Sequence, residues 1–130
     1  MATARDIVTA ALRKIQVCPV GEAPAAEDAE QGLGELNRMI AFWAAGDVDI
    51  EQPSLTLEES LVVDAKFHDG IVLQLALRLA SDYSRPATFA RDAEYAWRLI
   101  EANFKTLPTA TIDEGLLDLP SVLNYGARAY

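Results

Sequence analysis

Few residues in this chain have both the chemistry and the spacing that catalysis needs. His68 is the single histidine, and it stands directly before Asp69. A His–Asp pair is typical of general-base chemistry, but side chains adjacent in sequence do not face one another on a helix. The chain also has no Gly-x-Ser-x-Gly sequence that would expose a serine nucleophile. We therefore predict a surface or capping role for His68.

Carboxylates are plentiful, and they occur in close pairs: Glu27 with Glu30, Glu58 with Glu59, and Asp113 with Glu114. A glycosidase needs two carboxylates at a fixed separation, one of them in an apolar pocket that raises its pKa. The pairs in this chain are typical of solvated surface clusters instead. A small hydrolase acting on cell wall is thus an alternative that acidic residues alone suggest, and we predict that the protein is not an enzyme.

Metal and cofactor sites are not indicated either. Asp47, Asp49 and Glu51 alternate as calcium ligands can, but the glycine and the distal glutamate of a calcium-binding loop are missing. Cys18 is the one cysteine, so it forms no disulfide within the chain and no cysteine-based metal site. We expect it to be a small buried thiol at a helix end. We expect no metal and no cofactor.

Charge and composition narrow the class of protein further. The net charge of the 130 residues is −9, from 20 acidic and 11 basic side chains. This balance argues against a nucleic-acid-binding surface, which needs clustered Lys and Arg to neutralise phosphates. An acidic surface also serves simple solubility. No apolar run approaches the roughly 20 residues that span a bilayer. We expect a protein that folds in the cytoplasm and does not enter membranes.

The elements that must position these side chains are helices. Apolar residues recur at helical spacing over 3–16, 25–45 and 69–83, and again in a fourth segment that begins near Pro86. Thr3 with Asp6 is a weak capping box, and Gly46 provides a left-handed stop for the second helix. The short link after the first helix favours an antiparallel neighbour. The sequence therefore predicts an all-α, small antiparallel bundle of about four helices.

The third helix and the stretch before it each leave two interpretations open. The third helix is apolar almost all round except for Gln74 and Arg78, so it is either the central core helix or is covered by a second subunit. Residues 47–67 form an irregular loop in which "LTLEESLVV" is either a short helix capped at Thr56 or an extended excursion. We favour the extended form.

Periodicity disappears after the fourth helix. We divide the chain into a helical domain, 1–105, and an extended docking tail, 106–130, which is too apolar for a disordered linker. The tail needs a surface to dock on, either its own helices or another subunit. Its candidate docking residues are Leu116, Leu117, Leu119, Val122, Leu123, Tyr125 and Tyr130.

Two sets of charges are candidates for contacts between subunits. Arg91, Arg98 and Lys105 recur every seven residues and form a basic strip on the fourth helix, and the second helix carries an acidic strip: Glu27, Glu30 and Glu35. A solvated face is the plainer interpretation. In a ring, the basic strip of one copy would meet the acidic strip of the next, which would set register more than affinity.

The amino-acid sequence of the first fifty residues also resembles a known family. "ARDIVTAALRKIQV", then "PAAEDAEQGLGELNRMIAFWAAGDVDI", and more loosely "IVLQLALRLASDYS", are similar to the head-to-tail adaptor (connector) proteins of tailed bacteriophages. These proteins are also called packaged-DNA stabilisation proteins or tail accessory factors. Members typically carry Gly where this chain has Gln16.

The resemblance implies a structural virion protein whose mechanism is assembly. Copies, usually twelve, would form a ring beneath the portal protein, join the capsid to the tail, help retain packaged DNA and present a surface to the next tail or stopper protein. DNA would pass through the channel without specific binding. The protein would assemble in the host cytoplasm and end in the virion, at the head–tail junction. The alternative is a cytoplasmic helical adaptor or regulator that forms a small oligomer through the third helix.

Overall fold

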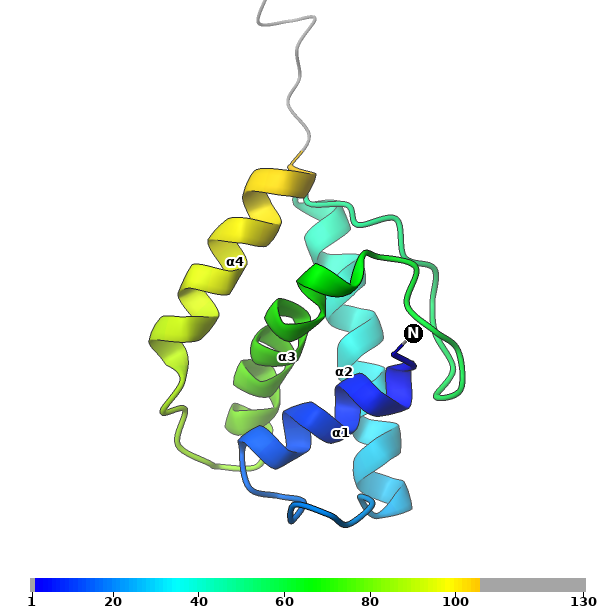
Figure 1. The fold of residues 1–130 in the computed structure, drawn as a ribbon, viewed down its shortest axis with the longest axis vertical. Helices are drawn as coiled ribbons and strands as arrows, with labels where there is room; N and C mark the ends of the chain where they lie inside the picture. Colours follow the sequence, from blue (N-terminus) through cyan, green and yellow to red (C-terminus); the bar gives the residue numbers. More distant parts are fainter. Residues whose placement is uncertain (1, 106–130) are drawn as a thin grey trace, which may run out of the picture.

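The computed structural model describes residues 2–105, and this part of the chain is all-α. It contains α1 (Ala4–Lys14), α2 (Ala26–Ala45), a single 3-10 turn η1 (Ala65–Phe67), α3 (His68–Asp82) and α4 (Ala90–Phe104) (Figure 1). Strand pairing within the described residues is limited to two isolated bridges. The predicted fold class, a small bundle of four helices, is confirmed. Residues 106–130, with the proposed docking tail, lie outside the described part.

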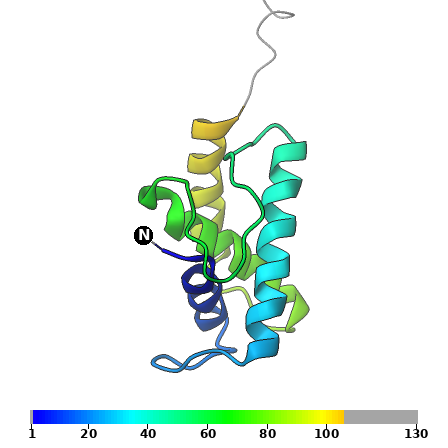
Figure 2. The same cartoon turned by 90° about the vertical axis from the view of Figure 1, so that its right-hand side faces the viewer.

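Three of the helices alternate in direction, and the fourth lies across them. α2, α3 and α4 run up, down and up, whereas α1 crosses in front of α3 and is seen nearly end-on in the perpendicular view (Figures 1 and 2). α1 is thus a neighbour of α2, as the sequence predicts, but a crossing neighbour. The link between them is longer than a hairpin loop, so it allows this change of direction.

The start of α1 follows the predicted capping box. The Thr3 hydroxyl accepts a hydrogen bond from the Asp6 backbone N–H at 3.3 Å, and the Asp6 carboxylate accepts one from the Thr3 N–H at 3.0 Å. These bonds satisfy two N–H groups that a helix start leaves free. The apolar stripe that follows is buried against the other helices, at Ala4, Ile7, Val8, Ala11 and Leu12.

Three helices end on a residue in the left-handed region that is not glycine. Gln16, Asp47 and Ser84 have φ of 63°, 78° and 55° and follow α1, α2 and α3. The backbone N–H of the next residue bonds back to the last turn each time, for example from Val48 to the Trp43 carbonyl at 2.9 Å. This is the Schellman pattern. The prediction that Gly46 takes the left-handed position is wrong: its φ is −103°, and the turn lies one residue later because Val48 must be buried.

α4 begins later than the sequence predicts. It starts at Ala90, not near Pro86, because α3 closes with a bond from the Arg85 N–H to the Ala80 carbonyl at 2.8 Å. The chain then needs a short irregular link to bring Phe89 into the core, where it is 8% exposed.

α3 is the central helix of the fold. Its buried residues, Ile71, Leu75, Ala76, Leu79 and Ala80, pack against α1, α2 and α4. Its two polar side chains are also used within the chain: Gln74 donates to the Ala93 carbonyl on α4, and Arg78 binds Glu35 on α2. Of the two interpretations, the central core helix is therefore the one that the structure supports.

The segment between α2 and η1 is irregular. The Asn37 side chain of α2 fixes its middle, since it donates to the Leu55 carbonyl at 3.0 Å and accepts from the Leu55 N–H at 2.9 Å. Leu61 and Val63 are buried farther along. No helix forms at Thr56, so the short-helix interpretation is wrong. Residues 56–59 instead form a turn, in which the Glu59 N–H donates to the Thr56 carbonyl at 3.2 Å, within an otherwise irregular segment.

Candidate interaction surfaces

α4 carries apolar side chains on two opposite faces. Tyr95 and Leu99 lie on one face, whereas Trp97 and Glu101 lie on the other, because residues two apart on a helix differ by about 200° around its axis. Tyr95 is 65% exposed and Leu99 46% exposed. The stripe through Ala93, Ala96 and Ile100 lies between these faces and is buried. α4 thus borders two separate surface hollows.

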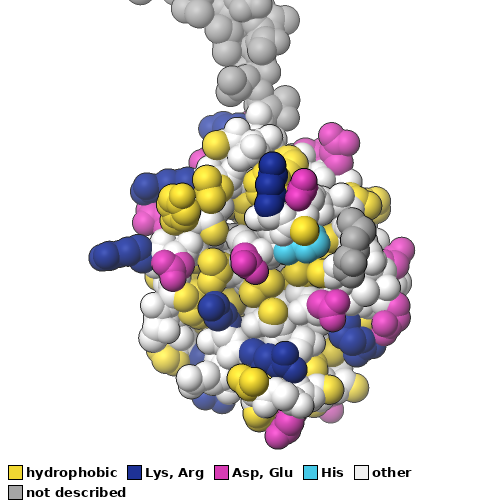
Figure 3. Space-filling model, viewed as in Figure 1, with side chains coloured by type: hydrophobic (Ala, Val, Ile, Leu, Met, Phe, Trp, Pro, Cys, Tyr) yellow, Lys and Arg dark blue, Asp and Glu magenta, His cyan; other side chains and the backbone are white. Residues whose placement is uncertain are grey.

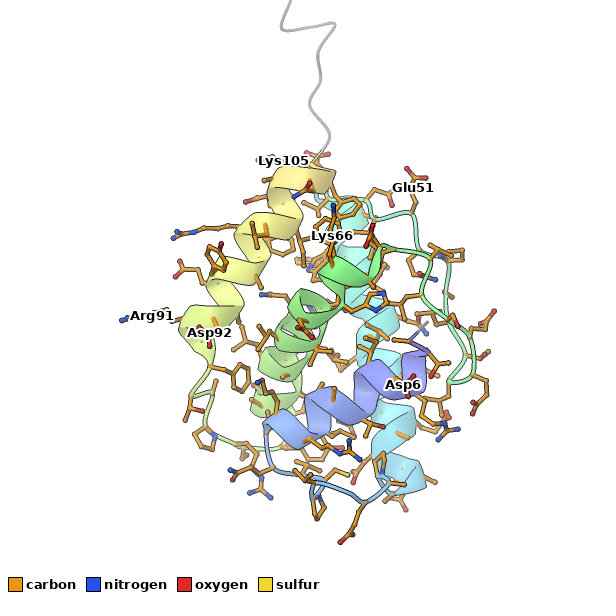
Figure 4. All side chains as sticks on the ribbon, in the orientation of Figure 1. Asp6, Glu51, Lys66, Arg91, Asp92 and Lys105 are labelled. Atoms are coloured by element: carbon orange, nitrogen blue, oxygen red, sulfur yellow. The ribbon has the colours of Figure 1, made fainter. Side chains whose placement is uncertain are left out.

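The first hollow, here called the α3–α4 groove, lies on the face that Figure 3 presents. Two adjoining cavities of about 300 and 310 Å³ share Asp69, Leu73 and Asp92. Apolar side chains line the groove, and hydrophobic atoms accordingly gather at the middle of this face, with charged groups around them (Figure 3). Lys66 lies toward the η1 end and Asp92 on the opposite side, near the start of α4 (Figure 4). The groove offers an apolar floor with charges of both signs at its rim.

The second hollow, here called the aromatic pocket, lies between the ends of α2 and α4. It measures about 270 Å³ and is lined by Phe42, Trp43, Ala45, Gly46, Val48, Trp97 and Glu101. The Trp43 and Trp97 rings lie 5.0 Å apart between centroids. Phe42 is 69% exposed, and the Arg78 guanidinium stands 5.9 Å from its ring centroid. The pocket is therefore an open apolar surface with an aromatic floor.

The basic strip of α4 is partly neutralised by its own helix. Arg98 pairs with Glu94 at 3.2 Å and Lys105 with Glu101 at 3.9 Å, both four residues apart. Arg91 is exposed and points away from the body of the bundle (Figure 4). Such exposed pairs add little stability. The strip remains a prediction as a contact between subunits.

The acidic strip divides into two parts. Glu27 and Glu30 are exposed in the first turns of α2. Glu35 is instead engaged within the chain, because its carboxylate accepts hydrogen bonds from Arg38 at 2.6 Å and Arg78 at 3.1 Å. The Arg38 hydrogen bond lowers the pKa of Glu35, burial opposes this effect, and Arg78 lowers it further. Glu35 thus ties α2 to α3.

A second polar contact joins the same two helices. The Tyr83 hydroxyl donates to the Asp28 carboxylate at 2.7 Å. Burial, followed by the Asp28 hydrogen bond, raises the pKa of Tyr83 to about 12. This contact closes the end of α3 onto the beginning of α2.

Several residues considered for catalysis or metal binding make structural contacts within the chain. His68 begins α3, and its Nε2 lies 3.1 Å from the Val63 carbonyl oxygen. Glu58 pairs with Arg5, and Glu59 accepts a hydrogen bond from the Thr56 N–H at 2.7 Å. Within residues 2–105, no three His, Cys, Asp or Glu side chains come together as a metal site would require.

Two further sequence predictions bear on these surfaces. Cys18 is buried after the end of α1, as expected, and its thiol donates to the Glu22 carbonyl at 3.1 Å. None of the described helices combines the length and the hydrophobicity that a membrane crossing requires. The candidate tail residues, from Leu116 to Tyr130, lie outside the described residues, so their docking remains a prediction.

The two hollows were not predicted from the sequence, although a signal for each is present. Tyr95 and Leu99 are four residues apart and lie off the main apolar stripe of α4, which marks a second apolar face. Phe42 likewise lies beside Trp43 but outside the stripe through Leu36, Ile40 and Trp43, which marks an apolar side chain off the core-facing side of α2. The sequence does not indicate which helix packs next to each of these apolar faces. A comparison with known protein families and with curated proteins found no match.

Proposed function

We propose that the protein is a structural adaptor of a tailed bacteriophage, a ring subunit that attaches beneath the portal, joins capsid to tail and helps retain packaged DNA. The resemblance of its first fifty residues to that family supports this function. Those residues form α1, the link and α2, so the similar stretch is a continuous structural unit. The proposed mechanism is assembly and includes no catalytic step.

The observation that carries the proposal is the pair of apolar surfaces on opposite sides of α4. A ring built by head-to-tail contacts needs two different surfaces on each subunit, one to offer and one to receive. The α3–α4 groove and the aromatic pocket meet this requirement, because they lie on different faces of α4. A twofold dimer would need one self-complementary surface only.

Charge supports the same arrangement. Arg91 on α4 and the exposed Glu27 and Glu30 on α2 would attract each other between neighbouring copies, which sets register and speeds association more than it adds affinity. With a net charge of −9 per copy, a ring would repel DNA from an acidic channel wall, so that the genome passes without specific binding. The tail, 106–130, would dock on the portal or on the adjacent subunit.

The alternative, a cytoplasmic helical adaptor or regulator, was based on an oligomer formed through the third helix. α3 is enclosed by α1, α2 and α4, so its buried face is not free for a second subunit. A small oligomer could use the same two surfaces beside α4. The two functions therefore predict different partners, and binding to the portal protein distinguishes them.

The test uses the full chain and the portal ring of the same phage. Sedimentation and electron microscopy of the mixture should give a ring of this protein on the portal. Leu99→Glu should prevent ring growth, because it puts a charge into the α3–α4 groove. Val20→Glu is the matched control, since Val20 is 89% exposed and lines neither hollow.

Three results would count against the proposal. The first is no association of the wild-type protein with the portal. The second is normal ring growth by the Leu99→Glu protein with unchanged helix content. The third concerns the tail: particles that lack residues 106–130 should fail to join heads to tails, and particles that assemble and keep their genomes without it would remove the tail from the mechanism.

A further inference from the structure

The end of the described chain lies directly at the aromatic pocket. Lys105 follows α4 with extended φ and ψ of −71° and 131° and forms an antiparallel bridge with Val48. Val48 is 3% exposed and lines the pocket. Because the bridge is antiparallel, a continuation of the same pairing beyond Lys105 would run alongside the residues before Val48, which are Asp47 and Gly46. Gly46 lines the pocket as well.

The pocket has room for an additional apolar side chain. Gly46 contributes no side chain, and a β-carbon at this position would meet only the backbone oxygens of Trp43 and Phe42, at 3.7 and 3.8 Å. The exposed Phe42 ring and the half-buried Trp97 border the same space. Apolar surface of this kind gains free energy when a hydrocarbon group covers it.

We infer that the aromatic pocket is the docking site of Leu107 of the same chain. Side chains alternate along an extended chain, so an extended continuation would place Leu107 on the same side as Lys105. In an antiparallel bridge that side is shared with Val48, whose side chain lines the pocket. The ladder cannot continue past Val48, since Asp47 turns the backbone at φ 78°. Apolar contact with the pocket is therefore what holds Leu107.

The occupant belongs to the same chain because only one residue separates Leu107 from the bridge. An intramolecular contact across so short a link has a high effective concentration, whereas a second copy must also pay the entropy of association. Docking of Leu107 fixes where the tail departs from the bundle, on the side of α4 opposite the α3–α4 groove. The inference is tested on the free protein. In the ring proposed above, the surface that a subunit presents on this side of α4 would then be the aromatic pocket with Leu107 docked in it.

The two tryptophans of the chain both line this pocket. Their intrinsic fluorescence therefore reports whether the pocket is shielded from water. In the full-length protein, without portal, Leu107→Ser should shift tryptophan emission to the red and increase quenching by acrylamide. The equilibrium constant for docking at the pocket should fall about tenfold, because burying part of a leucine side chain contributes about that factor. Leu117→Ser is the matched control and should leave emission unchanged. Far-ultraviolet circular dichroism checks that the helices are intact.

A second variant tests the space above Gly46. In the Gly46→Leu protein, the new leucine side chain should fill the pocket. Adding Leu107→Ser to this variant should then produce no further change in emission. Identical emission and quenching of Leu107→Ser and wild type would overturn the inference. So would equal shifts in Leu107→Ser and Leu117→Ser, which would assign the cover to another segment, or emission that changes on dilution, which would assign it to a second copy.

Discussion

Gly32 of α2 lies so close to Val8 of α1 that a β-carbon at position 32 would overlap the Val8 Cγ1 atom. Val8 is fully buried, and its branched side chain has little freedom to move away. The absence of a side chain at position 32 is therefore what allows α1 to cross α2 at this distance. The crossing, in turn, places α1 over α3 and forms one wall of the α3–α4 groove.

The first prediction compares the two glycines of α2. Gly32→Ala should destabilise the protein by about 1–3 kcal/mol, because overpacking a core costs more than the helix propensity that alanine adds. Gly34→Ala should instead stabilise it by about 0.5–1 kcal/mol, since a β-carbon there meets only the flexible Arg38 guanidinium, at 3.4 Å. Urea unfolding of both variants measures the difference.

Val8→Ala adds a test of the contact itself. If Gly32 and Val8 are in direct contact, the cost of Gly32→Ala should be smaller in a Val8→Ala background, with a coupling energy of about 0.5–3 kcal/mol. Strictly additive effects of the two substitutions would contradict the close approach.

The second prediction concerns the end of α1. Gln16 has a φ of 63°, a conformation that costs a residue with a side chain about 1 kcal/mol and costs glycine nothing. Gln16→Gly should therefore raise the free energy of unfolding by roughly that amount. Ala10→Gly is the control, because it puts the same glycine inside α1 and should lower stability by about 0.5–1 kcal/mol. Loss of stability in both variants would argue against a left-handed residue at position 16.

Much of the helical architecture could be predicted from the sequence, because apolar side chains at helical spacing and the Thr3–Asp6 pair are local signals. The ends were harder. Glycine marks a left-handed position only statistically, and here Gln16, Asp47 and Ser84 adopt it while Gly46 does not. The tertiary burial of Val48 decides where α2 ends, and the sequence near Gly46 does not contain that information.

The surfaces beside α4 were missed for a related reason. Their lining residues come from segments far apart in the chain, such as Val48 and Trp97 in the aromatic pocket. Each side chain looks ordinary in its own helix. They form a common site only because the end of α2 approaches α4, where the Trp43 and Trp97 rings lie 5.0 Å apart. The close crossing of α1 over α2 likewise needs Gly32 beside Val8, a tertiary contact that periodicity does not reveal.

The third prediction is an acid-dependent loss of stability through Glu35. The two arginines hold the pKa of this carboxyl below its ordinary value of 4.5, so the unfolded chain binds a proton at higher pH than the folded protein does. The contribution is therefore present above pH 4.5 and is lost as pH falls through the folded-state pKa. Glu35→Gln should cost about 1–2 kcal/mol at neutral pH and progressively less below pH 4.5.

Glu30→Gln is the matched control for that substitution. It removes the same charge from an exposed position on the same helix and should change stability by less than about 0.5 kcal/mol. Urea unfolding at several pH values measures both variants. A cost of Glu35→Gln that stays constant from neutral pH into the acid range would contradict the ion-pair assignment.

The fourth prediction concerns alkaline pH and Tyr83. The pKa of Tyr83 is raised to about 12 in the folded protein from an ordinary value of 10.0. Its contribution to stability is therefore complete below pH 10.0 and is lost as pH rises toward 12, because the unfolded chain ionises first. Tyr83→Phe should cost about 1 kcal/mol at neutral pH, and the gap to wild type should narrow across that alkaline window.

Asp28→Asn separates the two causes of the shift. Removing the carboxylate should lower the pKa of Tyr83 only in part, because burial is the larger cause and remains. Difference absorbance of the phenolate, wild type against Tyr83→Phe, follows the titration, and urea unfolding along the same pH series follows the stability gap. A gap that stays constant through the alkaline range, or a phenol that titrates at its ordinary value in the folded protein, would show that Tyr83 does not donate to Asp28. The closure of α3 onto the start of α2 would then rest on apolar packing and on the Arg78–Glu35 pair.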